Sequence, residues 1–211
     1  MLVLELFCGT GSVGKVCKEM GVDVISLDMT NTYSEPTILC NILDWDYKSL
    51  NRVPDFIWAS PPCNSFSFFI NGNKNKPSKL SRDLKTLEPL NDVGRNGNNC
   101  LDKVIEIIMY FTELNKDLKF VIENPVGYMR RMEQVKYLDY TDTTYCNYND
   151  KLIRFKPTSF FNNFKLKLKD KCNFKKADHI HGYVNHLPLN EKYAIPQELI
   201  LEIFNQVVLS Y

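Results

Sequence analysis

The sequence predicts an α/β fold with a mostly parallel central sheet flanked by helices. Short apolar runs alternate with helix-forming stretches over the first 60 residues, which is typical of parallel strands joined by right-handed helical crossovers. Glycines follow the first apolar run, and polar or reactive residues follow later runs, at the positions where open α/β sheets bind ligands. A length of 211 residues fits one well-packed unit, so residues 1–211 are expected to form a single domain.

In the first half of the chain, the elements follow from the apolar runs and from residues that begin or end helices. Ser12 can cap a helix that runs to about Met20, and Gly21 closes it. The apolar runs on either side of this helix, and two later ones, are expected to be strands. These strands are residues 2–6, Val22–Leu27 with Asp28 at its end, Thr37–Leu39 and Asp55–Ala59.

The second half begins with residues 64–98, which are rich in Asn, Gly, Lys and Ser and are expected to be a mobile catalytic or substrate loop. Apolar residues at helical spacing then predict a core-facing helix over roughly residues 99–115. Residues 119–122 read as the next buried strand, and residues 143–168 as short strands separated by turns. A final helix, with Pro196 in its first turn, completes the core.

The composition bounds the class of protein. Apolar residues make up 44% and charged residues 24% of the chain, as in soluble globular proteins, and a net charge of +1 gives no general basic field. Seven cysteines without a Cys-x-x-Cys pair argue against a zinc site or a disulfide framework. With no signal peptide or membrane-spanning run predicted, a reducing compartment is expected: the cytoplasm, or the nucleus of a eukaryotic host.

Two local features of the sequence, a basic segment and a group of histidines, do not indicate a specific function. Between residues 151 and 176 there are nine Lys and Arg residues against one acid, Asp170, which fits either a solvated face or a face that contacts phosphates. His179, His181 and His186 are not accompanied by a clustered Cys or acid, so they are expected to be ordinary surface or loop histidines. No metal is therefore expected.

The glycine turn after the first strand indicates a cofactor site. Gly9 and Gly11 lie between that strand and its helix, where they let a ligand approach the backbone and the positive helix N-terminus. Asp28 ends the second strand and is placed to accept hydrogen bonds from ribose hydroxyls. A cofactor of the nucleoside type is therefore expected, and these residues leave both NAD and S-adenosylmethionine open.

A thiol and a carboxyl group are expected to face the same rim of the sheet. Cys63 follows an apolar strand and two prolines that force the chain to leave the sheet extended, and Glu123 ends another apolar strand. A thiolate beside a carboxyl group suits attack on an electron-poor ring carbon while the acid protonates the ring nitrogen. For this role the thiol must ionise below its free pKa of about 8.5.

These motifs, in their order and spacing, resemble those of the C5-cytosine DNA methyltransferases. The Pro-Pro-Cys-x-x-Phe-Ser and Glu-Asn-Pro pair is the specific part of the resemblance, which covers residues 2 to about 204. Further segments are similar to a compact branch of the family found in phages and viruses. The matching motifs are Phe7-x-Gly9-x-Gly11, Asp28, Ser60-Pro61-Pro62-Cys63-x-Ser65-Phe66-Ser67, Glu123-Asn124-Pro125, Lys156-Pro-Thr158 and Ala194-Ile-Pro-Gln-Glu-Leu199.

The resemblance implies a Rossmann-like, S-adenosylmethionine-dependent methyltransferase fold and a role for each matched residue. Cys63 would add to C6 of a flipped-out cytosine, Glu123 would hold and protonate N3, and the methyl group would go to C5. The cofactor would contact Phe7, Cys8, Gly9, Gly11, Asp28, Met29, Asp44, Ser60 and Pro61. The substrate would contact Pro62, Ser65, Phe66, Ser67, Asn124 and Pro125.

The sequence departs from the family pattern in three places. Where the family usually has Gln-x-Arg-x-Arg, only Arg154 is available as a third catalytic candidate. Asn41-Ile42 stands where the family often has Asp-Ile, with Asp44 nearby. No stretch is long enough for the family's separate target-recognition region, so a partner protein or a second copy of the chain could supply recognition.

Other functions remain compatible with these residues. The same chemistry would serve RNA, particularly tRNA, as well as DNA. Methylation of an exocyclic amine is disfavoured, because Cys63 stands where those enzymes need an aromatic residue after the prolines. A catalytically silent nucleic-acid-binding protein is the alternative outside enzymes, and the presence of both Cys63 and Glu123 argues against it.

Overall fold

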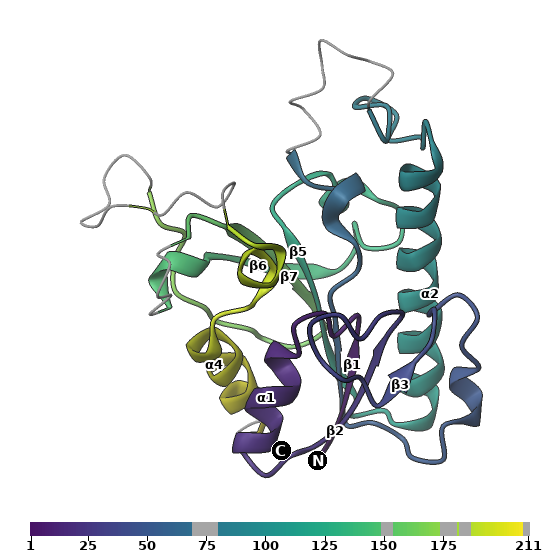
Figure 1. Cartoon of the computed structure of the whole chain (residues 1–211), viewed down its shortest axis with the longest axis vertical. Helices are drawn as coiled ribbons and strands as arrows, with labels where there is room; N and C mark the ends of the chain where they lie inside the picture. The colour runs from purple at the N-terminus through teal and green to yellow at the C-terminus, as the bar shows by residue number, and fades with distance from the viewer. Residues whose placement is uncertain (69–79, 149–153, 174–180, 182–186, 209–211) are drawn as a thin grey trace.

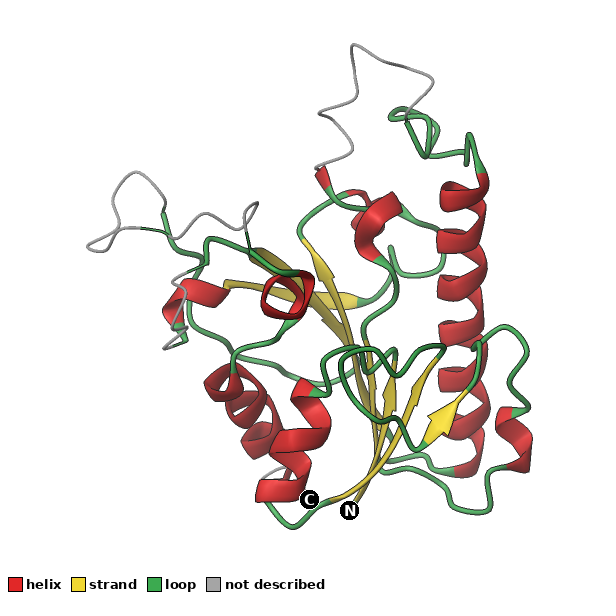
Figure 2. Cartoon of the chain, in the orientation of Figure 1, coloured by secondary structure: helices red, strands yellow, loops and turns green. Residues whose placement is uncertain are grey.

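The structure, a computed structural model of the chain, describes residues 1–68, 80–148, 154–173, 181 and 187–208. Within these ranges the chain forms a seven-stranded sheet with helices on both faces (Figure 1 and Figure 2). The predicted α/β fold class is thereby confirmed. None of the helices among these residues is both long and apolar enough to cross a membrane.

The strands, in chain order, are β1 (Leu2–Leu6), β2 (Asp23–Asp28), β3 (Ile38–Leu39), β4 (Phe56–Ala59), β5 (Lys119–Pro125), β6 (Asp139–Thr144) and β7 (Pro157–Asn162). They lie in the order β3-β2-β1-β4-β5-β7-β6. The first five are parallel, whereas β7 runs antiparallel to both β5 and β6. The chain winds outward from β1 to β3 and then returns to β4, so a topological switch point lies between β1 and β4.

The helices form one layer on each face of the sheet. They are α1 (Ser12–Glu19), α2 (Asp92–Leu114), α3 (Leu189–Tyr193) and α4 (Gln197–Val208). In Figure 1, α1 and α4 lie together on one side of the sheet and the long α2 lies on the other. The layer of α1 and α4 combines a helix from each end of the chain. The apolar side chains of both helices belong to one buried cluster, so α4 completes this part of the core.

Alternating side chains of the central strands fill the two cores. In β4, Ile57 and Ala59 pack with α2, whereas Phe56 and Trp58 pack with α1 and α4. Both faces are buried, which is why these strands read as continuous apolar runs rather than alternating ones. Truncation of Trp58, which is fully buried, is expected to cost about 3–5 kcal/mol of stability.

The predicted strands and helices agree with the structure within a few residues, except at the start of α2. The helix begins at Asp92, where Asn91 Oδ1 accepts a hydrogen bond from the Gly94 amide at 3.1 Å, and not at about residue 99. Gly94 and Gly97 have low helical propensity, so the sequence predicted a loop for this first part of the helix. They serve instead to let the helix approach its neighbours, since a Cβ on either would lie 2.1 Å from a neighbouring oxygen.

Residues 64–98 were expected to form a mobile loop. Those that the structure describes, 64–68 and 80–98, are largely packed into the fold. Arg82, which is fully buried, donates from Nε to the Ser65 carbonyl at 2.6 Å and from Nη1 to the Leu87 carbonyl at 2.7 Å. These bonds tie residues 80–91 to the chain that follows β4. Residues 69–79 lie outside the described residues, and the expected mobility stays a prediction.

Candidate active site

A cavity of about 420 Å³ lies at the carboxyl ends of β1, β2, β4 and β5. This is the topological switch point of the sheet, where open α/β folds bind their ligands. Its volume lies in the range of small-molecule sites. Its lining includes acidic, apolar and reactive groups from segments that are far apart in the sequence.

The glycine turn after β1 forms one wall of the cavity. Phe7, Gly9 and Gly11 all have positive φ angles of 61°, 49° and 67°, so the chain folds back tightly before α1. The Gly9 amide donates to Asp28 Oδ2 at 2.9 Å, and the Ser34 hydroxyl donates to the Gly9 carbonyl at 2.8 Å. Asp28 therefore orients the turn as well as lining the cavity.

A buried carboxyl group, Glu5, lies under this turn and also lines the cavity. Its Oε2 accepts a hydrogen bond from the Gly14 amide at 3.1 Å, in the first turns of α1. Burial raises the pKa of Glu5 to about 8, and the hydrogen bonds from the Gly14 and Val13 amides only partly oppose that rise. Sequence reasoning did not single out Glu5, because it looks like part of a strand.

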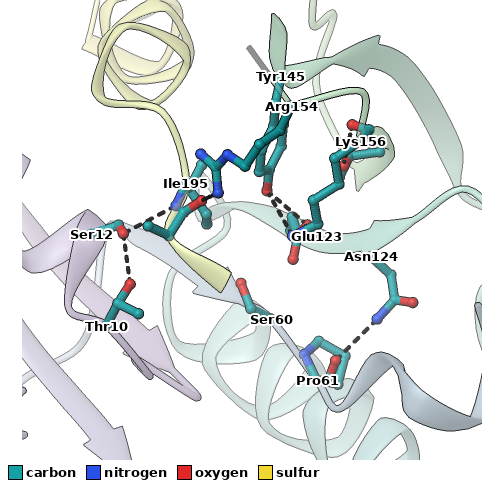
Figure 3. Close-up of polar contacts among 12 residues, drawn as sticks. Thr10, Ser12, Ser60, Pro61, Glu123, Asn124, Tyr145, Arg154, Lys156 and Ile195 are labelled. Atoms are coloured by element: carbon teal, nitrogen blue, oxygen red, sulfur yellow. Dashed lines mark hydrogen bonds and ion pairs between the residues drawn. The ribbon is translucent and has the colours of Figure 1, made fainter. Parts of the chain in front are cut away.

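The opposite wall is the turn that follows β4. Pro62 has the fixed φ of −50° expected of proline, and a short 3₁₀ turn, η2 (Cys63–Ser65), begins immediately after it. Asn124 Nδ2, from the end of β5, donates to the Pro61 carbonyl at 3.0 Å (Figure 3). This bond fixes the turn that presents Cys63 against the neighbouring strand. Asn124 itself is buried and does not line the cavity.

Cys63 is half-buried and lines the cavity together with Glu123. Burial raises the pKa of the Cys63 thiol above its ordinary value, the positive charge of Lys156 lowers it, and the negative charge of Glu123 raises it. The thiol is therefore held mainly in its protonated form in this state. Lys156 is the principal group that opposes this effect.

Glu123 lies in a network of buried polar groups (Figure 3). The Tyr145 hydroxyl donates to Glu123 Oε1 at 3.0 Å, and Lys156 Nζ lies 3.8 Å from the same oxygen. Lys156 also lies over the Tyr145 ring, with Nζ 4.6 Å from its centroid. Burial raises the pKa of Tyr145 well above its usual value, so its hydroxyl stays a hydrogen-bond donor to the carboxyl group.

Arg154 does not face the cavity. Its guanidinium donates to the carbonyl oxygens of Glu191 and Ala194, at 2.8 Å for Ala194, and lies over the Tyr145 ring. Tyr193 and Ile195, on either side of Ala194, do line the cavity. These contacts hold the segment of residues 191–194, and the expected catalytic role of Arg154 stays a prediction.

The C-terminal segment also contacts the glycine turn. The Ile195 amide donates to Ser12 Oγ at 3.1 Å, and Ser12 Oγ lies 2.8 Å from Thr10 Oγ1 (Figure 3). Residues separated by more than 180 positions are thus joined at the edge of the cavity. This contact has no sequence signal, because it depends on the return of the chain across the sheet.

The second half of the Pro-Pro-Cys motif is built into the core rather than exposed to a ligand. Ser65 and Phe66 are fully buried, and Ser67 is nearly so. Arg82 donates to the Ser65 hydroxyl at 3.2 Å, and its guanidinium lies 4.6 Å from the centroid of the Phe66 ring. The Phe66 carbonyl accepts the Tyr128 amide at 2.6 Å. None of these three residues lines the cavity, and their expected contacts with the substrate stay predictions.

The sequence-predicted residues therefore divide into two groups, and their functional roles stay predictions. The cavity lining includes Phe7, Cys8, Gly9, Asp28, Met29, Ser60, Pro61, Pro62, Cys63, Glu123 and Pro125. It does not include Gly11, Asp44, Ser65, Phe66, Ser67, Asn124 or Arg154; Asp44 is exposed beyond Asn41 and Ile42, which take its place. Lining residues that were not among the predicted site residues include Glu5, Ser12, Tyr33, Asn96, Cys100, Lys156, Tyr193 and Ile195.

Most described cations of the basic segment are occupied within the molecule. Lys156 faces Glu123, Lys169 pairs with Glu198, and Lys171 pairs with Asp142 at 3.1 Å. Lys165 and Lys167 are exposed. His179 and His186 lie outside the described residues.

Comparison with known proteins finds a viral relative. No family model matches the chain. A probable DNA (cytosine-5)-methyltransferase of Frog virus 3 (isolate Goorha) is 32% identical over 154 residues, which make up 71% of this chain and 65% of that relative. The chain thus spans somewhat less than two thirds of the relative's length. This similarity agrees with the resemblance of the motifs to the C5-cytosine DNA methyltransferases.

Matches among solved structures include two DNMT2 proteins. A DNMT2 mutant from Spodoptera frugiperda is 20% identical, with a TM-score of 0.46, and the match covers 86% of this chain and 54% of that one. The S. pombe Dnmt2 methyltransferase is 12% identical, with the same TM-score, and covers 86% and 57%. A methyltransferase subunit of a type I restriction-modification system from Streptococcus thermophilus is 13% identical, with a TM-score of 0.45, covering 77% and 39%.

Proposed function

We propose that this protein is a DNA (cytosine-5-)-methyltransferase that uses S-adenosylmethionine and forms a covalent bond through Cys63. The observation that carries the proposal is the pairing of Cys63 and Glu123 on one cavity, at the ends of the adjacent parallel strands β4 and β5. A nucleophile and an acid in this relation can act on two atoms of one ring.

The cavity residues suit S-adenosylmethionine. Asp28 offers carboxylate oxygens to a ribose diol, and the glycine turn leads into the N-terminus of α1. Phe7, Ile42 and Pro61 give an apolar lining for a purine ring. Glu5 adds a second carboxyl group, which is mainly protonated near neutral pH and would ionise more readily beside a cationic ligand. When bound, the cofactor supplies the methyl group for C5 of the substrate base.

Cys63 and Glu123 divide the work on the cytosine ring. The Cys63 thiolate adds to C6 while the Glu123 carboxyl group donates a proton to N3, so that the electron pair displaced from the C5–C6 bond makes C5 nucleophilic. After C5 is methylated, loss of the C5 proton to a base expels Cys63 as a thiolate and restores the C5–C6 double bond. The base must leave the stack for this, because C6 is not accessible within a duplex.

Lys156 supports both residues in this proposal. Its ammonium group favours the thiolate of Cys63 and lies 3.8 Å from the Glu123 carboxylate. Tyr145 donates to the same carboxylate oxygen and fixes which oxygen remains for the base.

The test is methyl transfer from labelled S-adenosylmethionine to DNA and, separately, to tRNA, followed by identification of the modified nucleoside. We expect 5-methylcytosine in DNA, and none with Cys63→Ala. Cys40→Ala is the matched control, because Cys40 is also half-buried but does not line the cavity.

Three results would contradict the proposal. Label on an exocyclic amine would overturn the attack through Cys63. Label in tRNA alone would show that the substrate is RNA and not DNA. Binding of nucleic acid and cofactor without any transfer would indicate a catalytically silent protein.

A further inference from the structure

A second cluster of reactive side chains lies away from the cavity, beside β6. Cys146, Cys172 and His181 each offer one ligand atom, and these atoms all lie within 4.8 Å of one another. None of the three lines the cavity. We propose that they bind a zinc ion, which joins the segment after β7 to the turn after β6.

The spacing of the ligand atoms suits zinc. Zn–S bonds of about 2.3 Å and Zn–N bonds of about 2.0–2.1 Å, at tetrahedral angles, place neighbouring ligand atoms about 3.5–3.8 Å apart. Cys172 Sγ lies 3.3 Å from His181 Nε2, close to that separation. Cysteine sulfur and histidine nitrogen are also the ligands that most often bind Zn²⁺ in proteins. Solvent supplies the fourth ligand, because all three residues are only half-buried.

Hydrogen bonds outside the cluster hold the two cysteines near each other. Five of them join residues 169–172 to residues 143–148, and in four of these a side chain of residues 143–148 bonds to the backbone of residues 169–172. Thr143 Oγ1 donates to the Lys169 carbonyl at 2.7 Å, and the Lys169 amide donates to Tyr148 Oη at 2.8 Å. Asn147 Nδ2 donates to the Asp170 carbonyl at 2.6 Å, and the Cys172 amide donates to Thr144 Oγ1 at 3.1 Å.

The imidazole is placed by a ring contact. The His181 ring lies edge-on to Phe155, with the two centroids 5.0 Å apart. Phe155 follows Arg154, which is held by its bonds to the segment of residues 191–194. Side chains that are already held lose little conformational entropy when a metal binds, so this arrangement favours affinity.

Sequence reasoning argued against zinc because the cysteines show no Cys-x-x-Cys spacing. The fold supplies the proximity instead: Cys146 comes from the 3₁₀ turn η6 (Tyr145–Asn147), directly after β6, whereas Cys172 lies ten residues after the end of β7. The same region leads on to Tyr193 and Ile195 in the cavity lining. The ion would therefore hold Cys146, Cys172 and His181 together without taking part in chemistry at the cavity.

The experiment is zinc analysis of the full chain, purified without chelators or an added histidine tag, by inductively coupled plasma mass spectrometry. We expect about one zinc per chain. Cys146→Ser, Cys172→Ser and His181→Asn should each lower the affinity for zinc by more than about tenfold. Cys40→Ser, which removes a half-buried cysteine outside the cluster, should keep the full zinc content.

A second measurement uses only the wild-type protein, so it does not depend on whether the variants fold. Wild-type protein stripped of metal should bind added Co²⁺ with the ultraviolet charge-transfer band of a cobalt–thiolate bond. Absence of both zinc and this band would overturn the proposal, as would equal zinc content in the folded Cys146→Ser and Cys40→Ser variants. A disulfide between Cys146 and Cys172, found by peptide mapping of freshly purified protein, would overturn it too.

Discussion

The two sides of the cavity are held in different ways. On the glycine-turn side, formed by residues 7–14 with Asp28, the backbone itself makes the wall, and its shape depends on positive φ angles and amide hydrogen bonds. On the strand-end side, formed by Cys63, Glu123 and Lys156, buried and half-buried side chains make the wall, and Glu123 contacts both Tyr145 and Lys156. Changes on the first side should affect folding and cofactor binding, and changes on the second should affect chemistry and its pH dependence.

The largest effect is expected on the strand-end side, from Glu123→Gln. The amide can still accept the Tyr145 hydrogen bond but cannot donate a proton as a carboxylic acid does, so kcat should fall about 10²- to 10⁴-fold. Single-turnover methyl transfer measures this, with binding of S-adenosylmethionine as the control. A variant that keeps wild-type kcat would remove Glu123 from the proposed mechanism.

On the glycine-turn side, Glu5→Gln should change how stability depends on pH. Glu5 has a folded-state pKa of about 8 against 4.5 as its ordinary value, because it is buried. Between these values only the unfolded chain releases the proton, so the free energy of unfolding should fall by about 1.4 kcal/mol per pH unit as pH rises. The contribution is complete below pH 4.5 and lost by about pH 8.

Urea unfolding at several pH values measures this dependence. Glu5→Gln keeps an acceptor for the Gly14 amide and has no proton to release, so its stability curve should lack the slope. Equal slopes for the two proteins over this range would show that Glu5 titrates normally in the folded state.

A smaller effect, of about tenfold, is expected when the charge on Lys156 is removed. Its ammonium group lowers the pKa of the Cys63 thiol, so Lys156→Met should raise that pKa and move the alkaline rise of the reaction rate to higher pH. At pH 7 the rate should fall about tenfold for each unit of pKa change, and less at high pH. The exposed Lys165 gives the matched control, Lys165→Met. A uniform loss at every pH would contradict this role.

The smallest effect, a threefold to tenfold change, is expected from Arg154→Gln, since the side chain acts through the segment of residues 191–194. Loss of its bonds to two carbonyl oxygens should weaken the placement of Tyr193 and Ile195. The Kd for S-adenosylmethionine should rise by about this amount, with kcat nearly unchanged. Isothermal titration and steady-state kinetics separate the two. A large loss of kcat with an unchanged Kd would restore Arg154 to a direct catalytic role.

The sequence was informative where function depends on strand ends. Apolar runs located β1, β4 and β5, and the residues that follow them, including Cys63 and Glu123, do line one cavity. Such patterns are local, because a strand's last residue and its neighbours in the chain reach the rim together.

The sequence was less informative where position depends on tertiary packing. Ser65 and Phe66 share a motif with Cys63, yet a buried arginine, Arg82, holds them in the core. Lys156 reaches Glu123 only because β7 pairs antiparallel with β5, a pairing that no periodicity specifies. Glycines in α2 hid the first turns of a helix, because packing overrides their low helical propensity.

The central claim, that Cys63 attacks the base, is tested most directly by trapping. DNA containing 5-fluorocytosine is incubated with the protein and S-adenosylmethionine, and any covalent complex is digested and mapped by mass spectrometry. Fluorine at C5 cannot leave as a proton does, so release of the thiolate is blocked and the adduct should accumulate on Cys63. An adduct on another residue, or no adduct from protein that binds both cofactor and DNA, would contradict the account.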